Sequence, residues 1–453
     1  MASRPTLSEN SALKQIFADF VHRSEKGWMW RRNWPSYNLP MREARLAFAC
    51  LATASLLGAC GHQTAGVRPS TGGDSGGGVS GSAGVGAGGV GAGGVGAGGV
   101  GAAGAAGATA GECALGMGPA TGGAAPVGTD LGELTVESVA VWKGDAKGAY
   151  TIIHDDICDW PIDSLFEVAE PELTQRGLNS AFGAIVLRCQ ERRLWPKLEL
   201  MRQHGHEIIN HTWDHHDIVT DGALAPLSLE MDQANQVLND NLVGQHTSFF
   251  IFPFDSFDDA AVEHLATLGY LGARAGTKGV NAANFPDGLR VMFDVWGGEN
   301  SIYDGQGDIL KLYVDLAISQ GGWSVREFHG IADTTFFAMN VDDYRAHLDY
   351  VKSKVDSGEL WVDTPSAVVR YRFSRQYCGV PSVDGYQLSF PMETCDCARY
   401  AAPLSVIVTT AVDAPSAVAT QDGKMLPTKK LAPNRFVVDV APLGGPVAVG
   451  GGS

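Results

Sequence analysis

The middle of the chain, from about residue 133 to about residue 375, alternates short apolar runs with stretches of helical periodicity. The run Tyr150 to Ile153 is apolar and β-branched, which is typical of a buried strand, and Ala181 to Leu187 is similar. Between them, Leu165 to Arg176 has helical spacing and is followed by Gly177, a common helix stop. Successive units of this kind predict helices packed around a parallel sheet.

Polar side chains that could bind a metal ion follow two of these runs. His211 and His215 stand four residues apart, so a helical turn would point both rings the same way. Asp155 and Asp156 end the first predicted strand. Separately, such a histidine pair is commonly a surface or core feature, and such an aspartate pair a solvated turn. Together, at two strand ends, they predict a metal site at the catalytic rim of a (β/α) barrel.

The run Gly-His-Glu-Ile-Ile-Asn-His-Thr-Trp-Asp-His at residues 205–215 resembles the second motif of the polysaccharide deacetylase family, the NodB-homology domains of carbohydrate esterase family 4. Asp155-Asp156 resembles the end of the family's first motif. The resemblance implies an α/β fold, a distorted (β/α) barrel of the NodB type, over residues 127–375. It also implies that Asp156, His211 and His215 bind a divalent metal, Zn²⁺ or another ion, and that Asp155 is the general base.

Two further family motifs are only partly present. Ile251-Phe252-Pro253-Phe254 keeps the proline and the aromatic residue of the third motif, but Ile251 stands where the family has an arginine that holds the catalytic aspartate. Arg274, at the end of the next predicted strand, is a candidate substitute, and a surface salt bridge is the alternative. Asp294-Val295-Trp296 is a candidate fourth motif that binds substrate, with Trp296 lining the acetyl or sugar pocket or else packed in the core.

His329 resembles the strand-end histidine of the family's fifth motif and would protonate the departing amine or alcohol. A hydrogen-bonded core histidine is the alternative. The backbone N–H of Phe254 would help to stabilise the oxyanion. Asp155 and Asp156 can share a site only where the strand curls, because consecutive strand residues face opposite ways. His154, where the family often has phenylalanine, could also approach the ion.

These residues predict a metal-dependent hydrolase that removes N- or O-linked acetyl groups from a polysaccharide or oligosaccharide. It would cleave carbon-nitrogen bonds other than peptide bonds, or acetyl esters. The missing motif-three arginine favours an alternative, a non-catalytic glycan-binding lipoprotein that retains the fold, and a smaller amide is a third possible substrate. The formal net charge of -17 and the sequence pI of about 5.1 argue against a nucleic-acid partner, while neutral glycans are compatible.

The first 126 residues predict export and anchoring rather than a core. Residues 41–60 have a basic start, an apolar run and the ending Leu-Leu-Gly-Ala-Cys, which resembles a lipoprotein signal peptide with Cys60 as the lipidated residue. Residues 1–40 are unassigned or untranslated, and the Gly/Ala/Ser-rich residues 61–126 predict a disordered linker. We therefore predict a lipid-anchored envelope protein, at the outer membrane, facing the periplasm or the cell surface.

Residues 376–453 form a cysteine-containing connection and a predicted small β unit. Leu404 to Thr409 and Phe436 to Val440 alternate apolar and polar positions, which predicts antiparallel strands that either cap the barrel or bind carbohydrate. Cysteines outside the cytoplasm predict disulfides, here of undetermined connectivity. The candidates that remain after signal removal and lipidation are Cys113, Cys158, Cys189, Cys378, Cys395 and Cys397.

Overall fold

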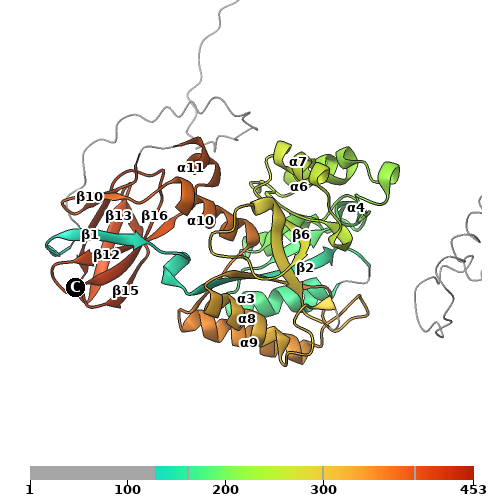
Figure 1. Cartoon of the computed structure of the whole chain (residues 1–453). Coiled ribbons are helices and arrows are strands. Elements are labelled where there is room, and N and C mark those ends of the chain that lie inside the picture. The colour runs from blue at the N-terminus through green and yellow to red at the C-terminus, as the bar shows by residue number, and fades with distance from the viewer. Residues whose placement is uncertain (1–127, 161–162, 298–299, 392–393, 453) are drawn as a thin grey trace, which may run out of the picture. The chain divides into compact units, whose positions relative to one another are not determined.

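The computed structural model describes residues 128–160, 163–297, 300–391 and 394–452 (Figure 1). The predicted leader, the lipidation site Cys60 and the linker 61–126 lie outside these residues, as does Cys113. Within the described ranges, no helix combines the length and the apolar character that crossing a bilayer requires.

Parallel strands form the predicted barrel. The hydrogen-bonded order is β3-β4-β5-β6-β7-β8-β2-β9, and an additional β2–β3 pairing closes the ring. One edge of β2 pairs with β8. The other edge pairs with β9 at the start of the strand and with β3 further along, so β9 lies beside the start of β2 and distorts the barrel. The NodB-type (β/α) barrel predicted for this region is therefore confirmed. The strands are β2 (Gly148–Ile157), β3 (Ala181–Ala184), β4 (Glu207–Asn210), β5 (Phe249–Ile251), β6 (Gly272–Lys278), β7 (Val291–Val295), β8 (Trp323–Phe328) and β9 (Leu360–Val362).

Helices cover the outside of the barrel, and Figure 1 shows α3, α8 and α9 close together beside the strands. The predicted helix Leu165 to Arg176 begins as the π-helix η2 (Leu165–Ala169) and ends as α3, with Gly177 in the left-handed conformation at its C-cap. The predicted strand Ala181 to Leu187 is shorter than expected, because α4 already begins at Val186. The helices are α3 (Glu170–Arg176), α4 (Val186–Glu191), α5 (Trp195–Gln203), α6 (Ala234–Asn241), α7 (Asp259–Thr267), α8 (Ile309–Gln320), α9 (Val341–Asp356) and α10 (Pro365–Tyr377).

Alternate residues of β2 belong to two different cores. Tyr150 and Ile152 pack in the apolar cluster that includes residues of α8 and α9. Ala149 and Ile153 pack with residues of the other barrel strands, such as Phe293 of β7, in a second cluster. Since side chains alternate along a strand, the face that carries Ile153 carries Asp155 next.

The C-terminal β unit is larger than predicted. It is a sandwich of two antiparallel sheets with the orders β1-β12-β16-β15 and β10-β11-β17-β13-β14, whose apolar faces share one core. Strand β1 (Leu134–Val139) pairs with β12, so the predicted boundary at residue 127 assigned this strand to the wrong unit. The other elements are β10 (Ser382–Asp384), β11 (Gln387–Ser389), α11 (Cys395–Tyr400), β12 (Leu404–Thr410), β13 (Ser416–Gln421), β14 (Lys424–Leu426), β15 (Thr428–Ala432), β16 (Arg435–Val440) and β17 (Val447–Gly452).

Candidate active site

Three predicted ligands converge at the carboxyl ends of β2 and β4. The Nε2 atoms of His211 and His215 each lie 3.3 Å from Oδ1 of Asp156. One potential ligand atom from each residue falls within 4.8 Å of the other two, which is the spacing of a shared coordination sphere. Oδ1 of Asp156 is buried and accepts no hydrogen bond from the described residues, as expected of an oxygen that a cation occupies.

Asp156 reaches this cluster because β2 curls at its end. Its φ angle is +64°, Cys158 follows at +78°, and the pairing of β2 with β3 shifts between His154 and Ile157. The curl turns the Asp156 carboxylate toward the same side as Asp155. Both aspartates can therefore share a site, as we expected for a curled strand end. Burial would raise the pKa of Asp156, but the nearby imidazoles of His211 and His215 hold it well below its usual range.

His211 is held in the tautomer that suits a metal ligand. Its Nδ1–H donates to the backbone oxygen of Ile251 at 3.1 Å, which leaves the Nε2 lone pair facing Asp156. Burial alone would lower the pKa of His211, but the carboxylates of Asp155 and Asp156 outweigh it and raise the pKa. Burial and the neighbouring His211 lower the pKa of His215 to about 4.

The loop that carries both histidines is not the predicted helical turn. Thr212 and His215 have φ angles of +68° and +61°, and the loop is anchored by side chains instead. The buried Glu230 accepts the backbone N–H groups of Trp213 and Asp214 at 3.0 and 3.1 Å. The histidine spacing therefore identified a shared site although the local structure that we expected there is wrong.

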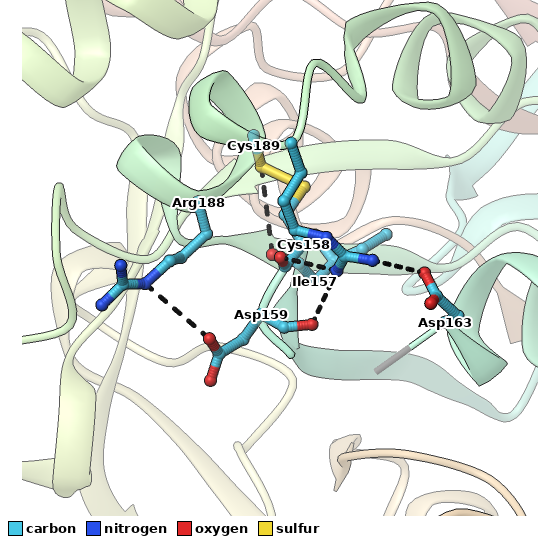
Figure 2. The surroundings of a disulfide bond; sticks show 7 residues. Ile157, Cys158, Asp159, Asp163, Arg188 and Cys189 are labelled. Carbon is cyan, nitrogen blue, oxygen red and sulfur yellow. Dashed lines mark hydrogen bonds and ion pairs between the residues drawn. A yellow bond between two sulfur atoms is a disulfide. The ribbon is translucent and has the colours of Figure 1, made fainter. Parts of the chain in front are cut away.

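A disulfide ties the strand end that carries Asp156 to helix α4. Cys158, two residues after Asp156, is bonded to Cys189 of α4 (Figure 2). At the end of the same helix, the Arg192 guanidinium donates to the backbone oxygens of Cys158 and Asp159 at 2.9 and 2.8 Å. The curled segment is thus fixed by one covalent and two polar contacts to α4.

Helix α4 also contacts the histidine loop. Its first backbone N–H groups, from Val186 and Leu187, donate to the backbone oxygens of Thr212 and Trp213 at 3.1 and 2.8 Å. Arg188 lies between the two segments, with Nε 3.8 Å from Asp159 and Nη2 3.1 Å from Asp214. One helix therefore holds both of the segments that supply the candidate metal ligands.

A second disulfide joins Cys378 to Cys397, and Cys395 is also disulfide-bonded. These bonds agree with the prediction of disulfides, and Cys158–Cys189 and Cys378–Cys397 are two of the pairings that the sequence left open. Cys158 and Cys189 are 31 residues apart in sequence, and neither lies in a motif that would have predicted their pairing.

Asp155 is held by Arg274, the residue predicted to replace the missing arginine. The guanidinium binds both carboxylate oxygens, with Nη1–Oδ1 at 2.9 Å and Nη2–Oδ2 at 2.6 Å. Burial would raise the pKa of Asp155, but Arg274 and the neighbouring imidazoles keep it below its ordinary value. Arg274 is itself 2% exposed, so the alternative of a surface salt bridge is excluded.

Glu327 on β8 is a site residue that the sequence analysis missed. Its Oε2 lies 3.2 Å from Nη1 of Arg274, and its Oε1 lies 3.7 Å from Nδ1 of His329. Burial raises the pKa of Glu327 well above its usual value, against the opposing effect of Arg274. A carboxylate inside an apolar strand, two residues before a candidate catalytic histidine and on the same face, was the available signal.

His329 faces the metal-ligand cluster, with Nε2 3.7 Å from Oδ2 of Asp156. Its backbone oxygen accepts the Nδ1–H of the buried His154 at 3.0 Å, and Nε2 of His154 accepts the Tyr344 hydroxyl at 2.9 Å. Burial lowers the pKa of His154 to about 4, so this ring is neutral. Both of its nitrogens are engaged by protein groups, so His154 supports the position of His329 and has no free nitrogen for the ion.

The predicted substrate-binding residues have different surroundings. Phe254 is 67% exposed, and its ring centroid lies 4.7 Å from that of His215. Trp296 is partly buried and donates its Nε1–H to the backbone oxygen of Phe337 at 2.7 Å. Asp294 is fully buried in an ion pair with Arg326 at 2.7 Å, so its prediction as a substrate-binding residue is wrong.

A closed parallel barrel with a histidine–aspartate cluster at the carboxyl ends of its strands defines the class as (β/α)-barrel proteins with a candidate metal centre. Residues 161–273 match the family model described as polysaccharide deacetylase. The chain thus contains a polysaccharide deacetylase domain of the NodB-homology type, and the resemblance predicted from its motifs is confirmed. The match includes His211, His215 and Phe254, whereas the two aspartates and His329 lie on either side of it.

Solved structures that are similar to part of this chain include those of three proteins. The Xyl-CE4 domain of a multidomain xylanase from the hindgut metagenome of Trinervitermes trinervoides is 12% identical, and the alignment covers 53% of this chain and 95% of that one (TM-score 0.34). A family 4 acetyl xylan esterase from Clostridium thermocellum, solved with cobalt, is 13% identical over 49% and 89% (0.33). The peptidoglycan deacetylase PdaC from Bacillus subtilis is 14% identical over 51% and 94% (0.33). No curated protein sequence matches the chain.

Proposed function

We propose that this chain is a metal-dependent deacetylase that hydrolyses N- or O-linked acetyl groups on a polysaccharide or oligosaccharide. The observation that carries this proposal is the convergence of Asp156, His211 and His215 around one buried carboxylate oxygen that accepts no hydrogen bond from the described residues. Beside that cluster stand a carboxylate and an imidazole that are not needed as ligands, Asp155 and His329. A hydrolase needs this combination of ligands, base and acid.

The three ligands fit a divalent ion of the Zn²⁺ type. Two imidazole nitrogens and one carboxylate oxygen suit zinc better than magnesium or calcium, which prefer oxygen ligands alone. When bound, such an ion lowers the pKa of a water molecule toward about 7 and polarises an acyl oxygen. Three protein ligands leave room for both of these groups.

Asp155 is the proposed general base. Its ionised form is favoured by the two contacts from Arg274, which also fix the orientation of the carboxylate. A base in this state can accept the proton of the attacking water. Arg274 acts here as a positioning residue, because it binds the aspartate and not the substrate.

His329 is the proposed general acid. It projects from the end of β8 toward the cluster, and its Nδ1 lies near Glu327 while its Nε2 lies near Asp156. A proton on Nε2 would pass to the nitrogen or oxygen that leaves the acetyl carbon. The backbone N–H of Phe254 is the proposed donor to the oxyanion, in a loop next to His215.

The non-catalytic alternative depended on the absence of the motif-three arginine. In the β5–β6 ladder, Ile251 is paired directly with Arg274. Arg274 therefore places a guanidinium on β6, one strand away from the motif-three position on β5. This guanidinium makes the contact with Asp155 that the motif-three arginine would make. This arrangement favours the enzyme over a binding module that has lost activity.

The proposal is tested by measuring acetate release by the purified full-length protein from penta-N-acetylchitopentaose, acetylated xylan and peptidoglycan. We expect release from at least one substrate, loss of activity with a chelator, and recovery with Zn²⁺. Short acetylated amides, assayed in parallel, distinguish a glycan deacetylase from a hydrolase of smaller amides. Glycan binding with no acetate release under any metal would favour the binding module.

Export and lipid anchoring remain predictions, because the signal segment and Cys60 lie outside the described residues. The Cys158–Cys189 and Cys378–Cys397 disulfides support an oxidising compartment outside the cytoplasm. Globomycin treatment of a producing bacterium, which blocks lipoprotein signal cleavage, should cause a larger precursor to accumulate. A Cys60→Ala variant should lose the lipid.

A further inference from the structure

Two exposed aromatic side chains, those of Phe254 and Phe336, lie beside the candidate site. Among the described residues, the large aromatic side chains with high exposure are Trp160, Phe254, Phe336 and Tyr386. Phe254 contacts the ring of His215, and Phe336 contacts the ring of His329 at a centroid distance of 5.4 Å. An apolar ring that remains open to solvent beside a catalytic group is available to contact substrate.

The loop that carries Phe336 is held in place by its own contacts. Asp333 accepts the Ser164 hydroxyl at 2.6 Å and the backbone N–H of Thr335 at 2.9 Å. Ala332 donates its N–H to the backbone oxygen of Met339 at 2.7 Å, which closes the base of the loop. Because both ends of the loop are fixed, the ring of Phe336 is presented at a defined place although 64% of its surface is exposed.

Trp296 belongs to this support. Its indole N–H donates to the backbone oxygen of Phe337, the neighbour of Phe336. The ring centroids of Phe336 and Phe337 lie 4.4 Å apart, and the two rings are edge to face. Trp296 therefore supports the loop whose tip is Phe336, and its own contact with substrate stays a prediction.

The proposed chemistry determines which part of the substrate lies next to Phe336. His329 protonates the atom that leaves the acetyl carbon, and this atom is attached to the sugar. The sugar ring must then lie on the His329 side of the acetyl group, where Phe336 is. Pyranose rings have apolar C–H faces that pack against aromatic rings.

We propose that Phe336 is a specificity-determining residue that stacks against a sugar ring on the leaving-group side, so that the substrate is an oligosaccharide or polysaccharide and not a small acetylated molecule. This inference rests on the proposed function. His215 and His329 both face the carboxylate of Asp156, so a glycan that contacts Phe254 beside one and Phe336 beside the other passes across the whole site. A small acetyl ester would reach the reacting groups without needing Phe336.

The test compares Phe336→Ala and Phe336→Trp with the wild type on penta-N-acetylchitopentaose, acetylated xylopentaose and 4-methylumbelliferyl acetate. For the glycan that is turned over, Phe336→Ala should raise KM about tenfold relative to KM for the small ester. Phe336→Trp should retain low KM because it keeps an aromatic face. Met425→Ala is the matched control, since this apolar residue of the C-terminal sandwich is also 64% exposed.

Two results would overturn the inference. One is an unchanged KM for the glycan in Phe336→Ala. The other is an equal loss of activity on glycan and ester, which would mean that the ring only supports His329.

Isothermal titration of both pentasaccharides separates this inference from the proposed function. If no acetate is released but glycan binding weakens about tenfold in Phe336→Ala, the enzyme proposal fails and the stacking role stands. If neither glycan binds the wild type, the stacking role fails as well.

Discussion

Arg274 lies directly opposite Ile251 in the parallel ladder between β5 and β6. Its guanidinium crosses to Asp155 and binds both carboxylate oxygens. The third sequence motif has therefore lost its arginine, but the next strand supplies one at the same level of the barrel. Buried charges of this kind are interdependent, because Arg274 also meets Glu327 at 3.2 Å and Asp255 at 3.4 Å.

Removal of the Arg274 guanidinium should impair both activity and stability. Arg274→Ala should lower kcat at least about a hundredfold, because Asp155 loses its orientation and its ionised form loses support. Stability should fall by about 3–5 kcal/mol, as expected when one partner of a buried ion pair is removed. Acetate release and urea unfolding measure the two effects.

Ile251→Arg introduced into the Arg274→Ala protein is the matched control, because it places an arginine at the motif-three position. We expect it to recover part of the lost kcat. Arg274→Lys should recover less, since an ammonium group cannot make the bidentate contact. Wild-type kcat in Arg274→Ala would show that Asp155 needs no such partner.

The roles of the two adjacent aspartates are separable. Asp155→Asn should lower kcat by about a hundredfold to ten-thousandfold while the protein still binds one zinc, since a general base contributes about this much. Asp156→Asn should lose zinc together with activity. Plasma mass spectrometry of dialysed protein, run beside the acetate assay, measures both. Zinc loss in Asp155→Asn with zinc retained in Asp156→Asn would exchange the two assignments.

The sequence predicted the barrel and most of the site because both leave local patterns. Strand ends such as Tyr150 to Asp156 carry their own apolar run and polar terminus, and the histidine motif is contiguous. Glu327 was missed because the available signal, a carboxylate two residues before His329, does not show that Arg274 on β6 is its partner. Asp294 was misassigned because its partner Arg326 is 32 residues away in sequence.

The C-terminal unit contains a strand pairing that local sequence patterns could not predict. Strands β1 and β12 pair although more than 260 residues separate them in the sequence, for example at Thr135 and Thr409. Alternation in β1 identifies a strand but does not identify the sheet to which it belongs. For the same reason the sequence did not predict that Cys158 would pair with Cys189, since this pairing depends on how α4 packs against the end of β2.

Helix α4 should determine metal affinity through its disulfide. In Cys158→Ser/Cys189→Ser, the segment after Asp156 loses its covalent attachment while the ligands themselves are unchanged. We expect zinc affinity to fall about tenfold to a hundredfold, the usual effect of removing support from a ligand. Competition with a chromogenic chelator measures this affinity without any need for turnover.

The matched control is Cys378→Ser/Cys397→Ser, which removes a disulfide between α10 and α11. Each double variant should lose about 2–4 kcal/mol of stability, because each loses one cross-link. Only the first should lose zinc affinity. Equal zinc affinity in both variants would mean that the Arg192 contacts and the helix N-terminus hold the ligand segments by themselves.

His347 of α9 is buried away from the candidate ligands. Its Nε2 is 3.2 Å from the Tyr150 hydroxyl, its Nδ1 has no hydrogen-bond partner among the described residues, and burial lowers its pKa to about 3. In the unfolded chain the pKa returns to about 6.5. Below that pH the unfolded state takes up a proton that the folded state does not, so stability falls as the pH drops from about 6.5 toward 3.

At pH 5 this one histidine should account for about 2 kcal/mol of lost stability. His347→Gln keeps an amide that can bond to Tyr150 but has no titrating group. Its free energy of unfolding should therefore decrease about 2 kcal/mol less than that of the wild type between pH 7 and pH 5. Urea unfolding at the two pH values measures the difference, with zinc removed so that ligand protonation does not contribute. Equal decreases in both proteins would mean that His347 is protonated in the folded state, with the helix open enough to admit water.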